Sequence, residues 1–243
     1  MSAVPCLEVR GITKRFGGLV ANDDVSFSVA EGEIVSVIGP NGAGKSTLFN
    51  CVTGFYRPNA GWVLFRGKDI TRESADRICK MGIARTFQIV QIITDMTTLE
   101  NVMTGAFLRN ARTRAAREKA DGILDFVGLA GKRDALSTEL TIADKKRLEV
   151  AMALATQPKL LMLDEAMAGL TPFELKEIIG LIRKVRQSGV TLIIVEHVME
   201  AVMELSDRGV VINSGRKIVE GTPRQVVEDK EVIQAYLGER FRA

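Results

Sequence analysis

The octapeptide GPNGAGKS at residues 39–46 constrains this chain most, because it directly follows IVSVI, a largely apolar and β-branched run at residues 34–38. Such a run predicts a strand that is buried on both faces. The octapeptide matches the pattern G-x-x-x-x-G-K-[ST], in which glycines let the backbone fold around a phosphate with its N–H groups pointing inward. A chance match in a chain of this length is roughly a one-in-a-hundred event. The sequence therefore predicts a nucleoside triphosphate site.

Individual residues of this loop have distinct expected roles. Lys45 reaches the β and γ oxygens, and Ser46 supplies a hydroxyl for Mg²⁺. A helix-forming segment, STLFNCV, follows, and the N–H groups at the start of a helix attract phosphate. The residues expected to bind the nucleotide are Gly39, Pro40, Asn41, Gly42, Ala43, Gly44, Lys45, Ser46 and Thr47.

Two later runs resemble the first strand: LLML at residues 160–163 and TLIIV at residues 191–195. Between them, residues 172–187 have helical spacing, with Thr171 as a cap before Pro172. Buried strands separated by helices predict an α/β fold, in which a parallel sheet carries helices on its faces.

The remaining segments depart from this pattern. Residues 7–29 alternate like strands, and the chain after Arg208 gives two strand-like pieces, GVVIN and RKIVEG, and then a polar helical tail to Ala243. Residues from about 91 to 157 contain helix-like runs with no buried strand between them. We therefore expect a single domain over residues 1–243, in which a mainly helical subdomain at about 91–157 is inserted into an α/β core of about 1–90 and 158–243.

An Asp-Glu pair follows the strand predicted at residues 160–163. Asp164 ends a strand that we expect to lie beside the strand of the phosphate loop, where its carboxylate can hold a metal through its waters. Glu165 can reach the water behind the γ-phosphate as a general base, a role that contributes typically 10² to 10⁴ in rate. Without the phosphate loop, the pair would be interpreted as a solvated strand end.

Two further polar residues are candidates for the same site. His197, the single histidine, follows TLIIV, and a third parallel strand would deliver it to the same sheet edge as Asp164, where its ring can hydrogen-bond the γ-phosphate. A lone histidine at a strand end is otherwise more often structural. Gln88 in RTFQ has a side-chain oxygen that can complete the Mg²⁺ shell or orient water, although an isolated glutamine is uninformative.

Composition narrows the function classes. Thirty-three basic and thirty acidic residues give a net charge of +3, which is too balanced to indicate nucleic acid. No aromatic residues interleave the arginines of ARTRAAREKADGI, so we expect a solvated helix there and no nucleic-acid partner. Three cysteines without C-x-x-C spacing indicate neither a disulfide framework nor a zinc site and fit the reducing cytosol. No apolar run approaches the roughly 18 residues that span a bilayer, so we do not expect the chain to cross a membrane alone.

The chain resembles the nucleotide-binding subunit of ABC transporters over nearly its whole length. The resemblance lies in the order of its features: the phosphate loop at residues 39–46, Gln88, a helical insert, the strand that ends at Asp164-Glu165, and His197. The resemblance implies a P-loop NTPase ABC cassette with a mainly parallel core sheet, an N-terminal antiparallel β part and an inserted helical subdomain. It also implies binding and hydrolysis of ATP with Mg²⁺. The implied catalytic residues are Glu165, His197, Gln88 and Lys45, and the implied metal ligands are Ser46, Gln88 and Asp164.

The resemblance assigns roles to two more segments. In the family an aromatic residue stacks on adenine, and Phe16 stands at the matching place, although it could also be a core residue. The family signature LSGGQ has its counterpart in LTIADKKR at residues 140–147. Its hydroxyl and backbone N–H groups suit a phosphate at a helix start. Because two cassettes of the family pack head to tail, the residues expected to contact a nucleotide held by the second subunit are Thr141, Ala143 and Asp144.

This chain departs from the family pattern at several positions. Ile142 and Ala143 replace the two signature glycines, and Asp144 replaces the glutamine. Ala166 replaces the usual proline after the catalytic glutamate, and Thr171 replaces a common aspartate, which would alter water positioning and communication across the dimer. Since the catalytic residues are all present, hydrolysis is still expected.

Within the family, several stretches look like the branched-chain amino-acid importers of bacteria, namely KRFGGLVA, VIGPNGAGKSTLFNCVTGFYRP, GIARTFQ followed by MTTLENV, and GTPRQVVEDKEVIQAYLGE. The resemblance implies two transmembrane permease subunits, a second ATPase subunit and, indirectly, a periplasmic solute-binding protein. It places the chain at the cytoplasmic face of the inner membrane. As the permease contact we expect residues 91–103, whose apolar residues are interrupted by little charge beside Gln88; the alternative is a buried helix.

Two other functions stay open at this point. A soluble P-loop kinase would need an acceptor pocket and a mobile lid. A non-transport ABC ATPase acting on the ribosome or DNA would resemble two cassettes in one chain or a cassette split by a long coiled coil, and the sequence shows neither.

Overall fold

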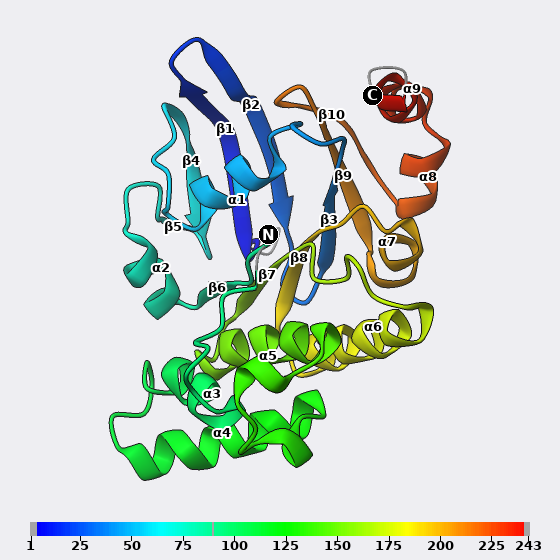
Figure 1. Ribbon diagram of the computed structural model, residues 1–243. Coiled ribbons are helices and arrows are strands. Elements are labelled where there is room, and N and C mark those ends of the chain that lie inside the picture. The colour runs from blue at the N-terminus through cyan, green and yellow to red at the C-terminus, as the bar shows by residue number, and fades with distance from the viewer. Residues whose placement is uncertain (1–3, 89, 241–243) are drawn as a thin grey trace.

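The computed structural model describes residues 4–88 and 90–240. Residues 1–3, 89 and 241–243, which belong to the predicted domain and its predicted C-terminal tail, lie outside the described residues. The described chain is built on two sheets, with a group of helices at one end of the molecule (Figure 1). The fold is the α/β cassette that the sequence predicts.

A four-stranded antiparallel sheet holds most of the N-terminal part. Its order is β2-β1-β4-β5, and β1 and β2 form a hairpin that turns at residues 17–18. Alternating side chains of β2, such as Val25, Phe27 and Val29, are buried. The antiparallel N-terminal part is thus confirmed, while β4 and β5 are strands that the sequence analysis did not find. The strands are β1 (Leu7–Phe16), β2 (Leu19–Val29), β4 (Ala60–Phe65) and β5 (Lys68–Asp69).

A six-stranded, mainly parallel sheet forms the centre, in the order β10-β9-β3-β8-β7-β6. Every residue of β3, β7 and β8 is buried, which confirms the prediction that these apolar runs are strands covered on both faces. Only β10 runs antiparallel to its neighbour β9. The strands are β3 (Ile34–Ile38), β6 (Ile83–Arg85), β7 (Leu160–Asp164), β8 (Thr191–Val195), β9 (Arg208–Asn213) and β10 (Arg216–Gly221).

The predicted neighbourhood of Asp164 is wrong in one respect. β7, which ends at Asp164, does not lie beside β3, because β8 pairs with both of them. The physical reason is that all three strands are apolar on both faces, so their composition does not distinguish a central position from a flanking one. The predicted common edge is confirmed, since Val195 of β8 is in register with Val37 of β3 and with Asp164.

Helices cover both faces of the central sheet. One apolar core lies between this sheet, the antiparallel sheet and α1 (Lys45–Val52), and a second lies between the sheet, α6 (Pro172–Gln187) and the helical group. Helix α6 begins as predicted, with Pro172 in its first turn and Thr171 as its N-cap in a capping box with Glu174. The other helices of the core are α2 (Ala75–Met81), α7 (Met199–Leu205), α8 (Pro223–Glu228) and α9 (Lys230–Arg240).

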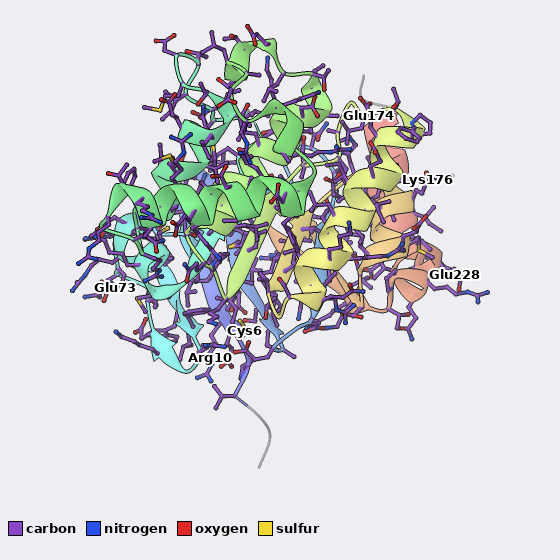
Figure 2. All side chains as sticks on the ribbon, turned by 90° about the horizontal axis from the view of Figure 1, so that it is seen from below. Cys6, Arg10, Glu73, Glu174, Lys176 and Glu228 are labelled. Carbon is purple, nitrogen blue, oxygen red and sulfur yellow. The ribbon has the colours of Figure 1, made fainter. Side chains whose placement is uncertain are left out.

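The helical group consists of α3 (Thr98–Ala106), α4 (Thr113–Val127) and α5 (Ile142–Ala155). The charged run predicted to be a solvated helix is α4, and its small apolar face is buried through Ala116, Ala120 and Leu124. Seen from below, α4 and α6 cross the base of the molecule, with Glu174 and Lys176 on the outer side of α6 (Figure 2).

The stretch at residues 91–103, predicted to be a permease contact, divides into two parts. Leu99 and Val102 of α3 are buried in the core that α3 shares with α4 and α5, so for these residues the alternative of a buried helix is correct. Gln91 and Ile93 are exposed and Ile92 is half-buried. The apolar spacing of α3 serves the packing of three helices, which is why it resembled a docking surface.

Two helix glycines give a matched test of this packing. A Cβ on Gly105 of α3 would lie 2.3 Å from the carbonyl oxygen of Met152 in α5, whereas a Cβ on Gly122 of α4 would meet no atom within 4 Å. We expect Gly105→Ala to lower the free energy of unfolding by about 1–3 kcal/mol because the helices must separate. We expect Gly122→Ala to raise it by up to about 1 kcal/mol through helix propensity. Urea denaturation of both variants checks this, and equal effects would contradict the close approach of α3 and α5.

Candidate active site

The phosphate loop lies between the end of β3 and the start of α1, as predicted. Gly44 has a φ of 103°, and a Cβ there would lie 2.2 Å from the carbonyl oxygen of Ala21 in β2. Asn22 of β2 donates from Nδ2 to the carbonyl oxygen of Gly44 at 3.1 Å. The loop is thus pressed against the antiparallel sheet, and only glycine fits at this point.

Lys45 is buried at the loop itself. Its Nζ donates to the carbonyl oxygens of Gly39 at 2.6 Å and Pro40 at 2.8 Å. The ammonium is therefore kept beside the loop backbone, where the charged oxygens of a phosphate would be stronger acceptors than these carbonyls. Ser46, the next residue, is exposed, and its hydroxyl is available to a metal.

A cavity of about 800 Å³ opens over this loop. Phe16, at the end of β1, lies at the cavity with 42% of its surface exposed, and its ring meets that of Tyr56 edge-on with centroids 5.3 Å apart. Its exposure is unlike that of a core phenylalanine, and Nζ of Lys14 lies 4.9 Å from its ring centroid. The lining residues are Phe16, Leu19, Val20, Ala21, Asn41, Gly42, Ala43, Gly44, Lys45, Ser46, Thr47, Gln88, Glu165, Ser214 and Gly215.

Gln88 and Glu165 meet at this cavity. Nε2 of Gln88 donates to Oε2 of Glu165 at 3.2 Å. Glu165 has a φ of 51°, a left-handed conformation that costs a residue with a side chain about 1–3 kcal/mol. Its backbone is held at both ends, since its N–H donates to the carbonyl oxygen of Val195 at 2.9 Å and its carbonyl oxygen accepts from Nζ of Lys146 at 2.8 Å. The structure therefore brings together the two side chains predicted to act on water.

Asp164 lies at the end of β7 and is 2% exposed. Its Oδ2 pairs with Arg85 at 3.0 Å, while Oδ1 is buried without a hydrogen-bond partner among the described residues. Burial raises the pKa of this carboxyl, and Arg85 opposes the shift. An oxygen left without a partner fits the predicted role, in which the carboxylate accepts from water bound to a metal. The described residues contain no group of three His, Cys, Asp or Glu side chains able to hold a metal, and Mg²⁺ is usually held by few protein ligands together with phosphates.

Arg85 is a site residue that the sequence analysis missed. It is buried beside Asp164, donates to Oδ1 of Asn50 at 2.6 Å, and lies 4.6 Å from the ring centroid of Phe87. Burial lowers the pKa of its guanidinium, and Asp164 opposes this. The available signal was a charged residue directly after the apolar pair of Ile83 and Ala84, where a strand end can place it beside another strand end.

Buried charged groups of α5 and β8 were missed as well. Glu196, directly after β8, accepts from the backbone N–H of Met167 at 2.8 Å, and burial raises its pKa to about 7. Glu149 of α5 accepts from the N–H of Phe87 at 2.8 Å, and burial raises its pKa to about 7 too. Lys146 lies near both, and burial lowers its pKa. These side chains hold the loops that carry the predicted catalytic residues.

Several predicted residues do not line this cavity, namely Gly39, Pro40, Asp164 and those that follow here. His197 follows β8 at the predicted sheet edge and is exposed, but it does not line the cavity. Thr141 caps α5: its hydroxyl accepts from the N–H of Asp144 at 3.2 Å and donates to the Asp144 carboxylate at 2.8 Å. Thr141, Ala143 and Asp144 do not line the cavity of the chain's own phosphate loop. Contact of these residues with a nucleotide stays a prediction.

The match to a protein family agrees with this geometry. Residues 22–168 match the family model described as ABC transporter. The chain belongs to this family. Residues 216–242 match a second model, described as branched-chain amino acid ATP-binding cassette transporter. Membership in the ABC transporter family makes the chain an ATP-binding and ATP-hydrolysing subunit of a transporter.

Individual relatives are similar over nearly their full length. The high-affinity branched-chain amino acid transport ATP-binding protein LivG of Escherichia coli (strain K12) is 41% identical, over 97% of this chain and 98% of the relative. A solved ATP-binding cassette of an ABC transporter in its ADP conformation has a TM-score of 0.88 at 34% identity, over 96% of this chain and 99% of that one. A dimeric cassette in a post-hydrolysis state, bound to ADP and Pi, has a TM-score of 0.81 at 25% identity, over 90% and 99%.

Among the described residues, every helix is too short or too polar to cross a bilayer.

The buried carboxyl of Glu196 makes stability depend on pH. Its pKa in the folded chain is about 7, above the ordinary value of 4.5, so its ionisation costs folded-state stability as pH rises from about 4.5 to about 7. Glutamine does not ionise. We expect the difference in free energy of unfolding, Glu196→Gln minus wild type, to rise by up to about 3 kcal/mol between pH 5 and pH 8.

Urea denaturation at several pH values measures this difference. A matched control is Glu228→Gln, the same change at an exposed carboxylate of α8. If both variants show the same dependence on pH, burial of Glu196 is not its cause.

Proposed function

We propose that this chain is the ATPase subunit of an importer for branched-chain or other hydrophobic amino acids. The observation that carries the proposal is the C-terminal match of residues 216–242 to the branched-chain cassette model, together with near full-length similarity to LivG. The solute is read by other subunits, so this chain supplies the work of transport. No described feature favours a soluble kinase or an ATPase of the ribosome or DNA over the transporter.

The proposed chemistry uses residues that line the cavity, together with Asp164 and His197, which lie at the ends of neighbouring strands on the same sheet edge. Lys45 and the loop N–H groups bind the β- and γ-phosphates, and Phe16 stacks on adenine. Ser46, Gln88 and Asp164, the last through water, would hold Mg²⁺, which neutralises phosphate charge. Glu165 takes the proton of the attacking water, and Gln88 orients that water. His197 binds the γ-phosphate from the neighbouring strand end. The unpaired Oδ1 of Asp164 and the contact of Gln88 with Glu165 support these roles.

We further propose a head-to-tail dimer in which Thr141, Ala143 and Asp144 contact the nucleotide of the second ATPase subunit. Their position away from the chain's own cavity supports this arrangement. The dimeric relative bound to ADP and Pi supports it as well. ATP then joins two surfaces through its γ-phosphate, and hydrolysis releases them.

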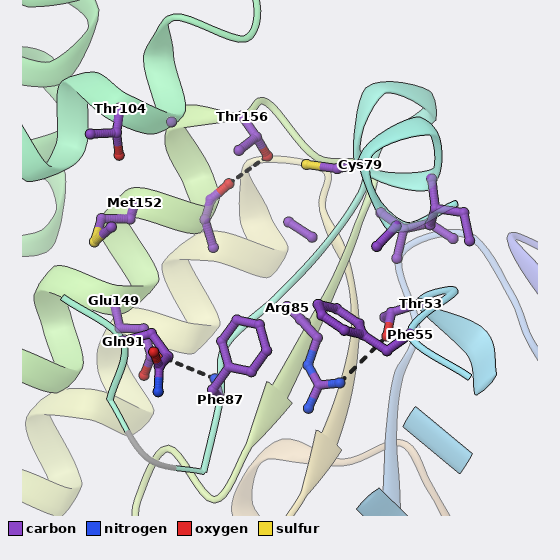
Figure 3. Close-up of a pocket in the computed structure, with 16 residues that line it drawn as sticks. Thr53, Phe55, Cys79, Arg85, Phe87, Gln91, Thr104, Glu149, Met152 and Thr156 are labelled. Carbon is purple, nitrogen blue, oxygen red and sulfur yellow. Dashed lines mark hydrogen bonds between the residues drawn. The ribbon is translucent and has the colours of Figure 1, made fainter. Parts of the chain in front are cut away.

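A second cavity, of about 310 Å³, lies between the core and the helical subdomain (Figure 3). Phe55, Phe87 and Met152 give it apolar walls, and Gln91 and Arg85 lie at its polar side. We propose that a permease subunit inserts an apolar segment here. Gln91 alone of the exposed residues in the predicted stretch 91–103 lines this cavity, which shifts the proposed contact toward Phe55 and Phe87. Arg85 then links the permease contact to Asp164.

In this proposal the chain works at the cytoplasmic face of the inner membrane with two permease subunits and, indirectly, a periplasmic binding protein. The division into a core of about 1–90 and 158–243 and a helical subdomain of about 91–157 belongs to the same proposal. It makes the second cavity a junction between two parts that can move relative to each other.

The dimer is tested by Glu165→Gln, which removes the general base and keeps the size of the side chain. We expect this variant to bind ATP with about wild-type affinity and to accumulate as a dimer with ATP and Mg²⁺, because the γ-phosphate persists. Size-exclusion chromatography with light scattering measures the mass. A monomer under these conditions would count against the shared site, and Lys45→Ala, expected to lose ATP binding, is the control for nucleotide dependence.

Transport is tested with Phe55→Ser in vesicles that contain the permease and binding protein. Phe55 is 53% exposed at the second cavity, so its loss removes apolar contact area without opening the core. We expect ATP-driven leucine uptake to fall at least about tenfold, since a central aromatic contact contributes about 2 kcal/mol. Isoleucine and valine should compete with leucine, and lysine should not.

The matched control is Trp62→Ser, which removes a 59% exposed aromatic side chain from β4 of the antiparallel sheet. Uptake by this variant should stay near wild type, and the ATPase activity of the isolated Phe55→Ser chain should be unchanged. Equal uptake by the two variants would place the permease contact elsewhere, and uptake driven equally by lysine would refute the proposed solute class.

A further inference from the structure

Two residues of α5 reach the two loops that carry the proposed catalytic pair. Lys146 and Glu149 lie three residues apart and therefore on one face of the helix. Nζ of Lys146 donates to the carbonyl oxygen of Glu165 at 2.8 Å. Oε1 of Glu149 accepts from the N–H of Phe87 at 2.8 Å, directly before Gln88 (Figure 3). Glu149 also accepts a hydrogen bond from the backbone of Gln91, so it holds the Gln88 segment on both sides.

The two residues belong to one buried group of charges. Lys146 and Glu149 are 9% and 7% exposed, and Glu196 is 1% exposed. The Lys146 ammonium is close enough to the carboxylates of Glu196, Glu149 and Glu165 to interact with them electrostatically. A buried charge without a counter-charge is strongly unfavourable, so these side chains depend on each other. Apolar residues could fill the same volume, but they could not bind the loop backbones.

The backbone of Glu165 needs such support. Its φ of 51° is unfavourable for a residue with a side chain, and conformations of this kind persist only where the surroundings hold them. The carbonyl oxygen of Val195 binds the N–H of Glu165, and the carbonyl oxygen of Glu165 accepts from the N–H of Ala168 at 3.3 Å as well as from Nζ of Lys146 at 2.8 Å. Of these three partners, only Lys146 uses a side chain, and it comes from the helical subdomain rather than the core.

We propose that Lys146 and Glu149 are positioning residues that hold Glu165 and Gln88 in the geometry for hydrolysis. The inference rests on the catalytic roles proposed above for those two side chains. Because α5 begins next to Thr141, the same helix connects the proposed contact with the second subunit's nucleotide to the chain's own catalytic pair. A shift of α5 therefore moves both catalytic side chains together.

The test compares Lys146→Met with Lys146→Arg in steady-state ATP hydrolysis. Methionine keeps the chain length but donates no hydrogen bond, so we expect kcat to fall roughly ten- to hundredfold, as for a small misplacement of reacting groups. The KM for ATP should stay within about twofold, because the phosphate loop is untouched. Arginine can still donate to the carbonyl oxygen of Glu165, and we expect it to restore kcat to within about threefold of wild type.

A double-mutant comparison separates positioning from general damage. In the Glu165→Gln background, Lys146→Met should not lower the residual single-turnover rate further, because both changes act through the same group. Glu149→Leu, which frees the N–H of Phe87, should behave like Lys146→Met, whereas Glu149→Gln keeps an acceptor and should stay near wild type. The control for removal of a lysine is Lys176→Met on the exposed side of α6.

Specific results would overturn the inference. An unchanged kcat in Lys146→Met, or equal loss in the Met and Arg variants, would show that the hydrogen bond does not position Glu165. If Lys146→Met does not fold, Lys146→Gln replaces it in the test. The glutamine side chain is too short to reach the carbonyl oxygen of Glu165, so the same results are expected. A wild-type rate in Glu165→Gln would instead refute the proposed catalytic role itself, which keeps the two failures distinguishable.

Discussion

The parallel register of β3, β8 and β7 is the constraint on which the rest of the site depends. Val37, Val195 and Asp164 stand at one level across these strands. Backbone hydrogen bonds fix this level, and the segments that leave the strands therefore start from one edge. The phosphate loop, Glu165 and His197 follow these three strand ends. Sequence positions more than 100 residues apart are thereby brought to the same sheet edge.

The second requirement is to hold the irregular loops at this sheet edge in place, although loops lack the hydrogen bonds of paired strands. The chain meets it with charged side chains inside the core. Arg85 joins Asp164 to Asn50, Glu196 binds the N–H of Met167, and Glu149 binds the N–H of Phe87. An unpaired N–H in such a place would cost about 1–3 kcal/mol. The charges are costly to bury, but they satisfy backbone groups that apolar residues would leave without partners, and so they fix the loops.

Much of the fold could be predicted from the sequence, because its strongest signals are local. The apolar runs, the glycine pattern and the cap at Thr171 each follow from a few neighbouring residues, and the structure confirms them. The order of the strands could not be predicted, since β7 and β8 are equally apolar. Arg85, Lys146 and Glu149 were missed for a related reason. Their roles depend on partners 19 to 79 residues away in the sequence. Without knowledge of those partners, a lysine or glutamate in a helix is interpreted as a solvated residue.

The altered signature has a local capping arrangement that bears on the proposed shared site. The hydroxyl of Thr141 caps α5 and binds Asp144. At this helix start, the N–H groups of Ile142 and Ala143 are therefore the donors that the cap does not use. The carboxylate of Asp144 would by itself repel a phosphate. Although burial alone would raise its pKa, hydrogen bonds from Lys132 and Thr141 bring it below the ordinary value.

Lys132 therefore has two effects at this helix start. It forms an ion pair with Asp144, which offsets the negative charge. It also gives that carboxylate a partner other than Thr141, so the hydroxyl can turn from Asp144 toward a phosphate without leaving the carboxylate unpaired. The family signature has glycines at this place, whereas this chain has an ion pair that comes from outside the helix. In the proposed dimer, Lys132 therefore joins the stretch from Leu140 to Arg147 in setting the contact with the second subunit's nucleotide.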